Sequence, residues 1–138
     1  MYLILKKILI PLIASLLIPN PIRSHDQPAH EICKNAKDYI GCLKANKTFT
    51  SMEKAAASGA IASLKCLQSR NLVTQNEADL AIKEAFKELN IPIDAKDDPK
   101  VIEVAEEISS FYQVDCRTML DTNQIKMQKI IYEEFFNN

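Results

Sequence analysis

Apolar side chains recur every three or four residues along most of the chain from residue 28 onward, which is the period of an amphipathic α-helix. This pattern predicts helices over about residues 51–70, 75–89, 99–113 and 122–136. Polar residues and prolines separate these segments. We therefore expect an all-α fold, a small orthogonal or bundled array of about five to six helices.

Two of the helix starts carry a capping box, in which Ser or Thr is followed three residues later by Glu or Gln. Thr50 and Glu53 have this spacing before the helix at 51–70, and Thr74 and Glu77 have it before the helix at 75–89. Only residues 71–73 then remain between the two helices, so the sequence predicts a helix, a tight turn and a second helix.

Residues 28–46 have helical spacing but allow two interpretations. In one continuous helix, Cys33 and Cys42 would lie about 13.5 Å apart on opposite sides, too far for a disulfide. A break near Lys37 and Asp38, where Asp38 can cap a second helix, would bring the two sulfurs within reach. We favour this helical hairpin over 28–46.

Residues 1–24 resemble an export signal. Lys6 and Lys7 precede an almost unbroken apolar run at residues 8–18, and Ser24 offers a small residue for cleavage. The alternative, an uncleaved membrane anchor, would need about 20 apolar residues, more than the run before Pro19 provides. We expect a signal peptide at 1–24, a single helical domain at 25–138, a periplasmic or secreted location, and no stable membrane insertion after cleavage.

The composition agrees with a small helical domain and argues against nucleic-acid binding. The chain has only two Gly and no Trp, which suits helices joined by short connections. Removing Lys6, Lys7 and Arg23 with residues 1–24 leaves 14 of the 17 basic residues against 18 acidic ones, a net charge of −4. A weakly acidic domain with scattered lysines has no basic surface for nucleic acid.

The four cysteines, Cys33, Cys42, Cys66 and Cys116, allow three disulfide connectivities. Local closure favours Cys33–Cys42 with Cys66–Cys116, and an oxidising compartment would preserve both bonds. Closing loops of about 10 and about 51 residues would stabilise the fold by roughly 2.7 and 4.1 kcal/mol. A zinc site is disfavoured because the paired cysteine spacing of zinc knuckles is absent.

Few residues are candidates for metal chemistry, and we expect no cofactor. Cleavage after Ser24 would make His25 the N-terminus, where its amine and imidazole could bind a metal together with His30, the other histidine. Asp94, Asp97 and Asp98 suggest calcium, but an oxygen ligand and a glycine are missing from the positions that an EF-hand loop requires. We expect Asp98 to cap a helix instead.

No residues are predicted to be catalytic. The chain has no nucleophile elbow and no Cys-x-x-Cys motif, and no pair of carboxylates stands out. Among the aromatic residues, Phe135 and Phe136 are adjacent near the end of a predicted helix and must point in different directions. One of them would then be exposed as an anchor for a partner.

Residues 30–42 read HEICKNAKDYIGC, with the pattern H-x-x-C-x-x-A-x-D-Y-x-G-C. This segment resembles the start of uncharacterised small exported helical proteins of marine cyanobacteria. The resemblance implies export and a paired Cys33 and Cys42, and it implies no activity.

Three functions are therefore considered. The first is a non-enzymatic protein-interaction module in which disulfides compensate for a small core. The second is a carrier of a small apolar ligand between helices, suggested by the many alanines facing Ile and Phe. The third is a metal-binding protein or enzyme that uses the N-terminal His. The sequence leaves the oligomeric state open.

Overall fold

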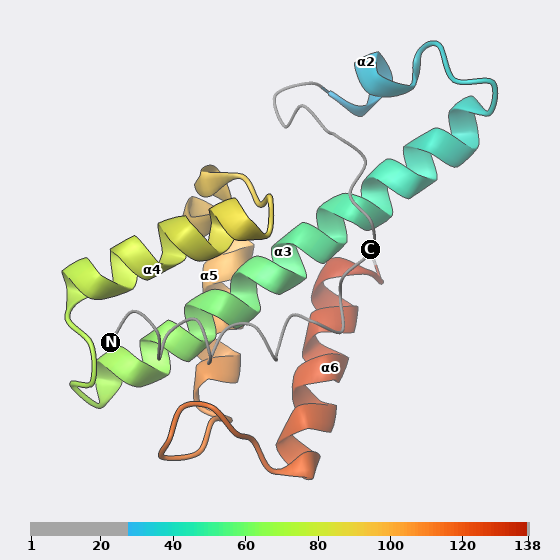
Figure 1. Ribbon diagram of the computed structural model, residues 1–138. Coiled ribbons are helices and arrows are strands. Elements are labelled where there is room, and N and C mark those ends of the chain that lie inside the picture. The colour runs from blue at the N-terminus through green and yellow to red at the C-terminus, as the bar shows by residue number, and fades with distance from the viewer. Residues whose placement is uncertain (1–27, 138) are drawn as a thin grey trace.

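The computed structural model describes residues 28–137, which form an all-α fold (Figure 1). The described elements are α2 (Ala29–Cys33), α3 (Tyr39–Ser69), α4 (Gln75–Glu88), the 3-10 helix η2 (Ile93–Asp97), α5 (Pro99–Ser109) and α6 (Asp121–Phe135). Within these residues there is no strand beyond an isolated antiparallel bridge between Tyr112 and Met119. The predicted all-α, disulfide-stapled fold is confirmed.

The long helix α3 is the axis of the fold, and its length contradicts the predicted boundary near residue 50. It runs unbroken for 31 residues, so the helices predicted to end at 46 and to begin at 51 are one. Thr50 does not cap a helix there, because its hydroxyl donates to the carbonyl of Asn46 at 3.1 Å. A threonine inside a helix can satisfy its hydroxyl on the preceding turn in this way. The Thr50–Glu53 spacing was therefore a wrong indication of a helix start.

The predicted break near Lys37 and Asp38 is present. The carboxylate of Asp38 accepts a hydrogen bond from the Gly41 amide at 2.8 Å and caps α3. A Cβ on Gly41 would clash with the Asp38 carboxylate, so a larger residue there would displace the capping side chain. The short helix α2 folds back on α3, and the Cα atoms of Cys33 and Cys42 are 5.7 Å apart across their disulfide.

The hydrophobic core surrounds the C-terminal half of α3, from Ala55 onward. Helix α5 packs along α3 more extensively than any other described helix, with α4 and α6 on other sides (Figure 1). Small residues on α3 permit this close approach: the Ser58 hydroxyl donates to the Val101 carbonyl on α5 at 3.3 Å. Among the largest fully buried side chains are Leu64, Phe86, Val101, Val104 and Ile108.

Both helices of the predicted helix-turn-helix end on an asparagine with a left-handed backbone. Asn71 after α3 has φ 56° and Asn90 after α4 has φ 54°. The amides of the next residues, Leu72 and Ile91, reach back to carbonyls five residues earlier at 2.9 and 2.8 Å, as in a Schellman motif. The capping box of Thr74 and Glu77 is also formed, so the sequence identified this turn correctly.

Helix α5 is four residues shorter than predicted, because it ends at Ser109 rather than at residue 113. The hydroxyls of Ser109 and Ser110 donate to carbonyls of the preceding turn. Beyond them Tyr112 forms the bridge to Met119, which turns the chain back. Helix α6 starts and ends one residue earlier than expected.

Candidate functional site

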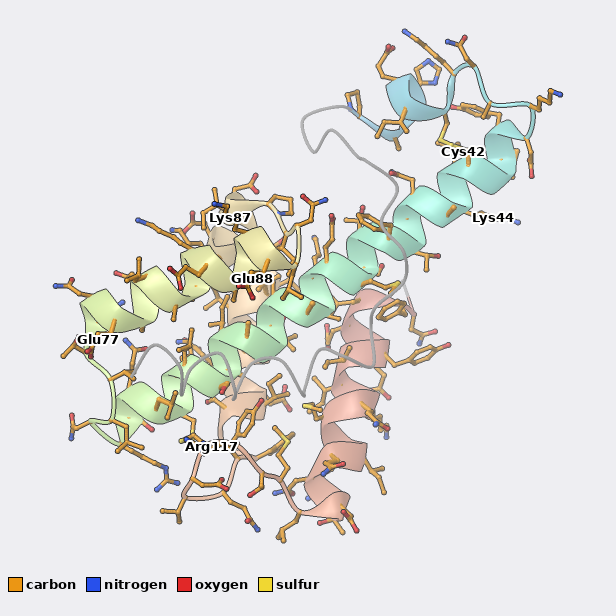
Figure 2. All side chains as sticks on the ribbon, viewed as in Figure 1. Cys42, Lys44, Glu77, Lys87, Glu88 and Arg117 are labelled. Atoms are coloured by element: carbon orange, nitrogen blue, oxygen red, sulfur yellow. A yellow bond between two sulfur atoms is a disulfide. The ribbon has the colours of Figure 1, made fainter. Side chains whose placement is uncertain are left out.

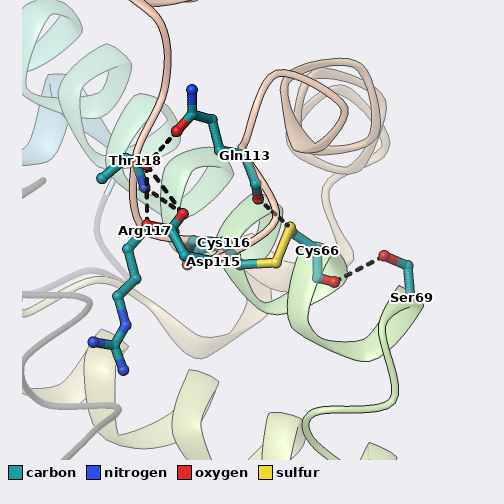
Figure 3. Close-up of a disulfide and its surroundings, with 8 residues drawn as sticks. Cys66, Ser69, Gln113, Asp115, Cys116, Arg117 and Thr118 are labelled. Atoms are coloured by element: carbon teal, nitrogen blue, oxygen red, sulfur yellow. Dashed lines mark hydrogen bonds between the residues drawn. A yellow bond between two sulfur atoms is a disulfide. The ribbon is translucent and has the colours of Figure 1, made fainter.

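The disulfide between Cys66 and Cys116 lies in the core and joins α3 to the loop between α5 and α6 (Figure 3). Asp115 shapes this loop, since its carboxylate accepts from the amides of Arg117 and Thr118, both at 3.0 Å. These backbone hydrogen bonds lower the pKa of Asp115. Cys116 itself has a φ of 52°, a conformation that non-glycine residues seldom adopt. The Cys66–Cys116 disulfide therefore holds this loop against α3.

The Cys33–Cys42 disulfide lies outside the hydrophobic core. Among the described residues, none before Ala55 belongs to the buried hydrophobic cluster. Figure 2 shows Cys42 and Lys44 at the end of α3 remote from Glu77 and Arg117. This bond therefore holds α2 on a part of α3 that contributes no side chain to that cluster.

Of the two histidines, only His30 lies within the described residues. It is exposed at the surface, and its Nδ1 is 2.9 Å from the hydroxyl of Tyr39 in an edge-to-face contact. His25 lies outside the described part of the chain. Within residues 28–137, no group of three His, Cys, Asp or Glu side chains is placed to hold a metal ion.

Two of the three acidic residues considered for calcium, Asp97 and Asp98, have other partners. Asp98 caps α5 as expected, accepting from the amides of Lys100 at 2.8 Å and Val101 at 3.3 Å. Its carboxylate also pairs with Lys54 of α3 at 2.8 Å, and this contact is the main cause of its lowered pKa. Asp97 pairs with its neighbour Lys96 at 2.8 Å.

One buried polar group was not anticipated from the sequence. The side chain of Tyr112 is 5% exposed, and its hydroxyl has no hydrogen-bond partner within the described structure. Burial raises the pKa of Tyr112 to about 12. A tyrosine at a helical spacing looks the same in sequence whether or not its hydroxyl is paired, so no pattern could have identified this one.

The alanines that suggested a carrier take part in helix packing. Ala57 and Ala62 of α3 are fully buried in the cluster that includes Val101 and Ala105 of α5. Their small side chains let the two helices approach closely, which is a sufficient reason for their presence.

Phe135 and Phe136 point in different directions, as expected of adjacent residues on a helix, but neither of them is fully exposed. Phe135 is buried in the core, while Phe136 is half-buried. The reason is helical geometry: adjacent residues differ by about 100°, so only one can face α3 and α5. The ring of Phe136 stacks on Tyr132 with centroids 6.4 Å apart and planes 7° from parallel.

Helix α6 is apolar on two opposite sides. On the inner side, Met127, Ile130 and Ile131 pack against the core together with Phe135. On the opposite side, Ile125 is 66% exposed and Tyr132 is 59% exposed. At about 100° per residue, Ile125, Tyr132 and Phe136 fall within about 40° of one another, and we call these three residues the outer stripe. Figure 1 shows α6 at the edge of the described structure, where one of its sides faces away from the other helices.

The remaining exposed apolar residues do not form a comparable surface. Leu80 lies on α4 and Ile93 on η2, and isolated exposed apolar residues are normal. The connections between helices carry three more, Leu72, Val114 and Leu120. Near α2, Ile32, Tyr39 and Ile40 are exposed, but Tyr39 is already engaged by His30. The outer stripe is therefore the candidate functional surface.

None of the described helices combines the length and the apolar character that crossing a bilayer requires. No protein-family model, curated protein or solved structure matches the chain.

Proposed function

We propose that the protein is exported and acts, without catalysis, as a protein-binding module whose contact surface is the outer stripe of α6. The observation that carries the proposal is the second apolar side of α6, where Ile125 and Tyr132 are exposed. Phe136, which also packs against the core, stacks on Tyr132 at the end of this side. Large exposed apolar groups in a row are unfavourable in water, so a helix that keeps them is suited to a partner.

The chemistry of the stripe fits a binding surface. Tyrosine is enriched among the residues that dominate binding energy, because it buries a large area and loses few rotamers. The ring of Phe136 stacks on that of Tyr132, an arrangement that would favour one orientation of the tyrosine. Less conformational entropy is then lost when a partner covers the pair.

Export is supported by the apolar leader at residues 1–24 and by the two disulfides. The likeness of residues 30–42 to small exported proteins agrees with it, since the Cys33–Cys42 bond lies within that segment. The intact mass of the protein recovered from its host, alkylated without reductant, tests this. We expect the mass of residues 25–138 with no alkylation, and a full-length mass with four modified thiols would contradict export.

Binding is tested by placing a photo-crosslinking phenylalanine analogue at residue 132 in cells that produce the protein. The matched control carries the same analogue at Leu80 of α4, an apolar residue of similar exposure at 54%. We expect a crosslinked product from residue 132 that residue 80 does not give, and the added substitution Ile125→Asp should remove it. Identical products from both positions, or none from residue 132, would contradict the proposal.

A further inference from the structure

We propose that the outer stripe binds the same stripe of a second copy, so that two α6 helices pair antiparallel about a two-fold axis near Lys129. This inference rests on the proposed function and identifies the partner as the chain itself. Closed two-fold dimers are the commonest assemblies of identical chains, and in them one surface must be complementary to itself. The sequence of α6 meets that condition in its apolar and in its charged residues.

The apolar residues are self-complementary about the proposed axis. Ile125 and Tyr132 are seven residues apart, two helical turns, and therefore lie on the same side of α6. An axis between residues 128 and 129 brings Ile125 of one copy opposite Tyr132 of the second copy, and the reverse contact follows from symmetry. Phe136 then meets the first turn of the other helix, near Asp121.

The charged residues beside the stripe obey the same symmetry. Lys126 and Glu133 are also seven residues apart, and both lie on one flank of the outer stripe, about 80–100° from its centre. Flanking residues at this angle face each other in antiparallel helix pairs. The axis that pairs the apolar residues therefore places Lys126 opposite Glu133 of the second copy, twice in each dimer.

One residue, Lys129, opposes this arrangement. Lys129 lies next to the axis, so the two copies would bring their Lys129 side chains together. Within each copy, the Lys129 ammonium lies 3.8 Å from the Glu133 carboxylate. This carboxylate partly offsets the Lys129 charge and so weakens the repulsion between the two lysines. Helix α6 as a whole has two basic and three acidic side chains, so no large like charge keeps two copies apart.

A charge exchange tests the pairing. The dissociation constant of the purified protein with both disulfides is measured by sedimentation equilibrium for the wild type, Lys126→Glu, Glu133→Lys and the double variant. Each single change turns two attractive pairs into repulsive ones, and we expect about tenfold weaker dimerisation. The double variant restores opposite charges at both contacts and should return to about the wild-type affinity.

Two further variants serve as controls. Lys83→Glu on α4 makes the same charge change at another exposed lysine and should leave the dissociation constant unchanged. Lys129→Gln removes the like-charge contact at the axis and should tighten the dimer about twofold. Circular dichroism establishes that each variant is folded.

The inference is overturned if the wild type stays monomeric up to about 1 mM, or if it dimerises and neither single charge reversal weakens the dimer. Its failure can be told apart from that of the proposed function. A crosslink from residue 132 to a different protein, with a monomeric wild type, would keep the binding role and reject the second copy as partner. A crosslinked product with the mass of two copies, lost in Lys126→Glu, would support both.

Discussion

Lys54 in the middle of α3 and Asp98 at the start of α5 form an ion pair, with the ammonium and carboxylate 2.8 Å apart. The same carboxylate caps α5 through the amides of Lys100 and Val101. One side chain therefore both starts α5 and fixes its N-terminus against the central helix. The contact joins two elements that are distant in sequence, at the edge of the most extensive helix packing in the fold.

Two substitutions of Asp98 separate its two roles. Asp98→Asn keeps an oxygen for the cap but removes the charge, and we expect the free energy of unfolding to fall by about 0.5 kcal/mol at neutral pH. Asp98→Ala removes the cap as well and should cost about 1.5 kcal/mol. Urea denaturation measures both values, and equal losses for the two variants would show that the cap contributes nothing.

The pH dependence of the Asp98 contribution follows from its lowered pKa. A carboxyl group whose pKa is lower in the folded state stabilises the fold above its unfolded pKa, ordinarily 3.8, and loses that effect as the pH falls through the folded value. The difference in unfolding free energy between wild type and Asp98→Asn should therefore be larger at pH 7 than at pH 3. A difference that grows on acidification would contradict this assignment.

The two disulfides should differ in their effect on global stability. Replacing Cys66 and Cys116 by alanine removes a bond inside the core, and we expect a loss of about 2–5 kcal/mol. Replacing Cys33 and Cys42 should change the main unfolding transition by less than about 0.5 kcal/mol, because no described residue before Ala55 belongs to the hydrophobic cluster.

Hydrogen exchange adds a second measurement to this comparison. Without the Cys33–Cys42 bond, the amides of α2 should exchange faster while those of α5 keep their protection. A loss near the roughly 2.7 kcal/mol of the loop-entropy estimate would mean instead that α2 folds together with the core.

Much of the fold could be predicted from local sequence because its determinants are local. The Thr74–Glu77 capping box and the Asp38 and Asp98 caps each depend on residues within three or four positions. The cysteine pairing followed from the break that Asp38 introduces, since that break brings Cys33 near Cys42. These parts of the prediction needed no knowledge of tertiary contacts.

The errors arose where a local pattern has two physical outcomes. The Thr50–Glu53 spacing suits a helix start, but a threonine hydroxyl can equally donate to the carbonyl of the preceding turn, as Thr50 does with Asn46. For Phe135 and Phe136 the sequence left open which of them is exposed, because this depends on which side of α6 meets α3 and α5, and both sides are apolar. Only tertiary packing decides between them, so the outer stripe could not be assigned beforehand.

The buried hydroxyl of Tyr112 leads to a prediction at high pH. Tyr112→Phe removes an unpaired polar group and should leave stability unchanged or raise it by up to about 1 kcal/mol at neutral pH. Because burial raises the pKa of Tyr112 from 10.0 to about 12, the unfolded chain ionises first, and the wild type should lose stability as the pH rises above 10.

The loss expected from Tyr112 is about 1.4 kcal/mol per pH unit between these two values, and Tyr112→Phe should not show it. Denaturation of both proteins over this range measures the difference, since the other tyrosines are common to the two. A variant that is less stable than wild type by more than about 1 kcal/mol at neutral pH would show that the hydroxyl is hydrogen-bonded.

The left-handed conformation of Asn90 gives a prediction about the end of α4. At a φ of 54°, a glycine has no Cβ penalty, whereas alanine brings its Cβ close to the following carbonyl. Asn90→Gly should therefore be more stable than Asn90→Ala by about 1 kcal/mol. The stability of the wild type should lie between those of the two variants or close to that of the glycine variant. Thermal unfolding of the three proteins tests the order.

Asn71, with a φ of 56° and the same pattern of hydrogen bonds, should show the same order of stabilities. An alanine variant as stable as the glycine variant at both sites would contradict the left-handed assignment.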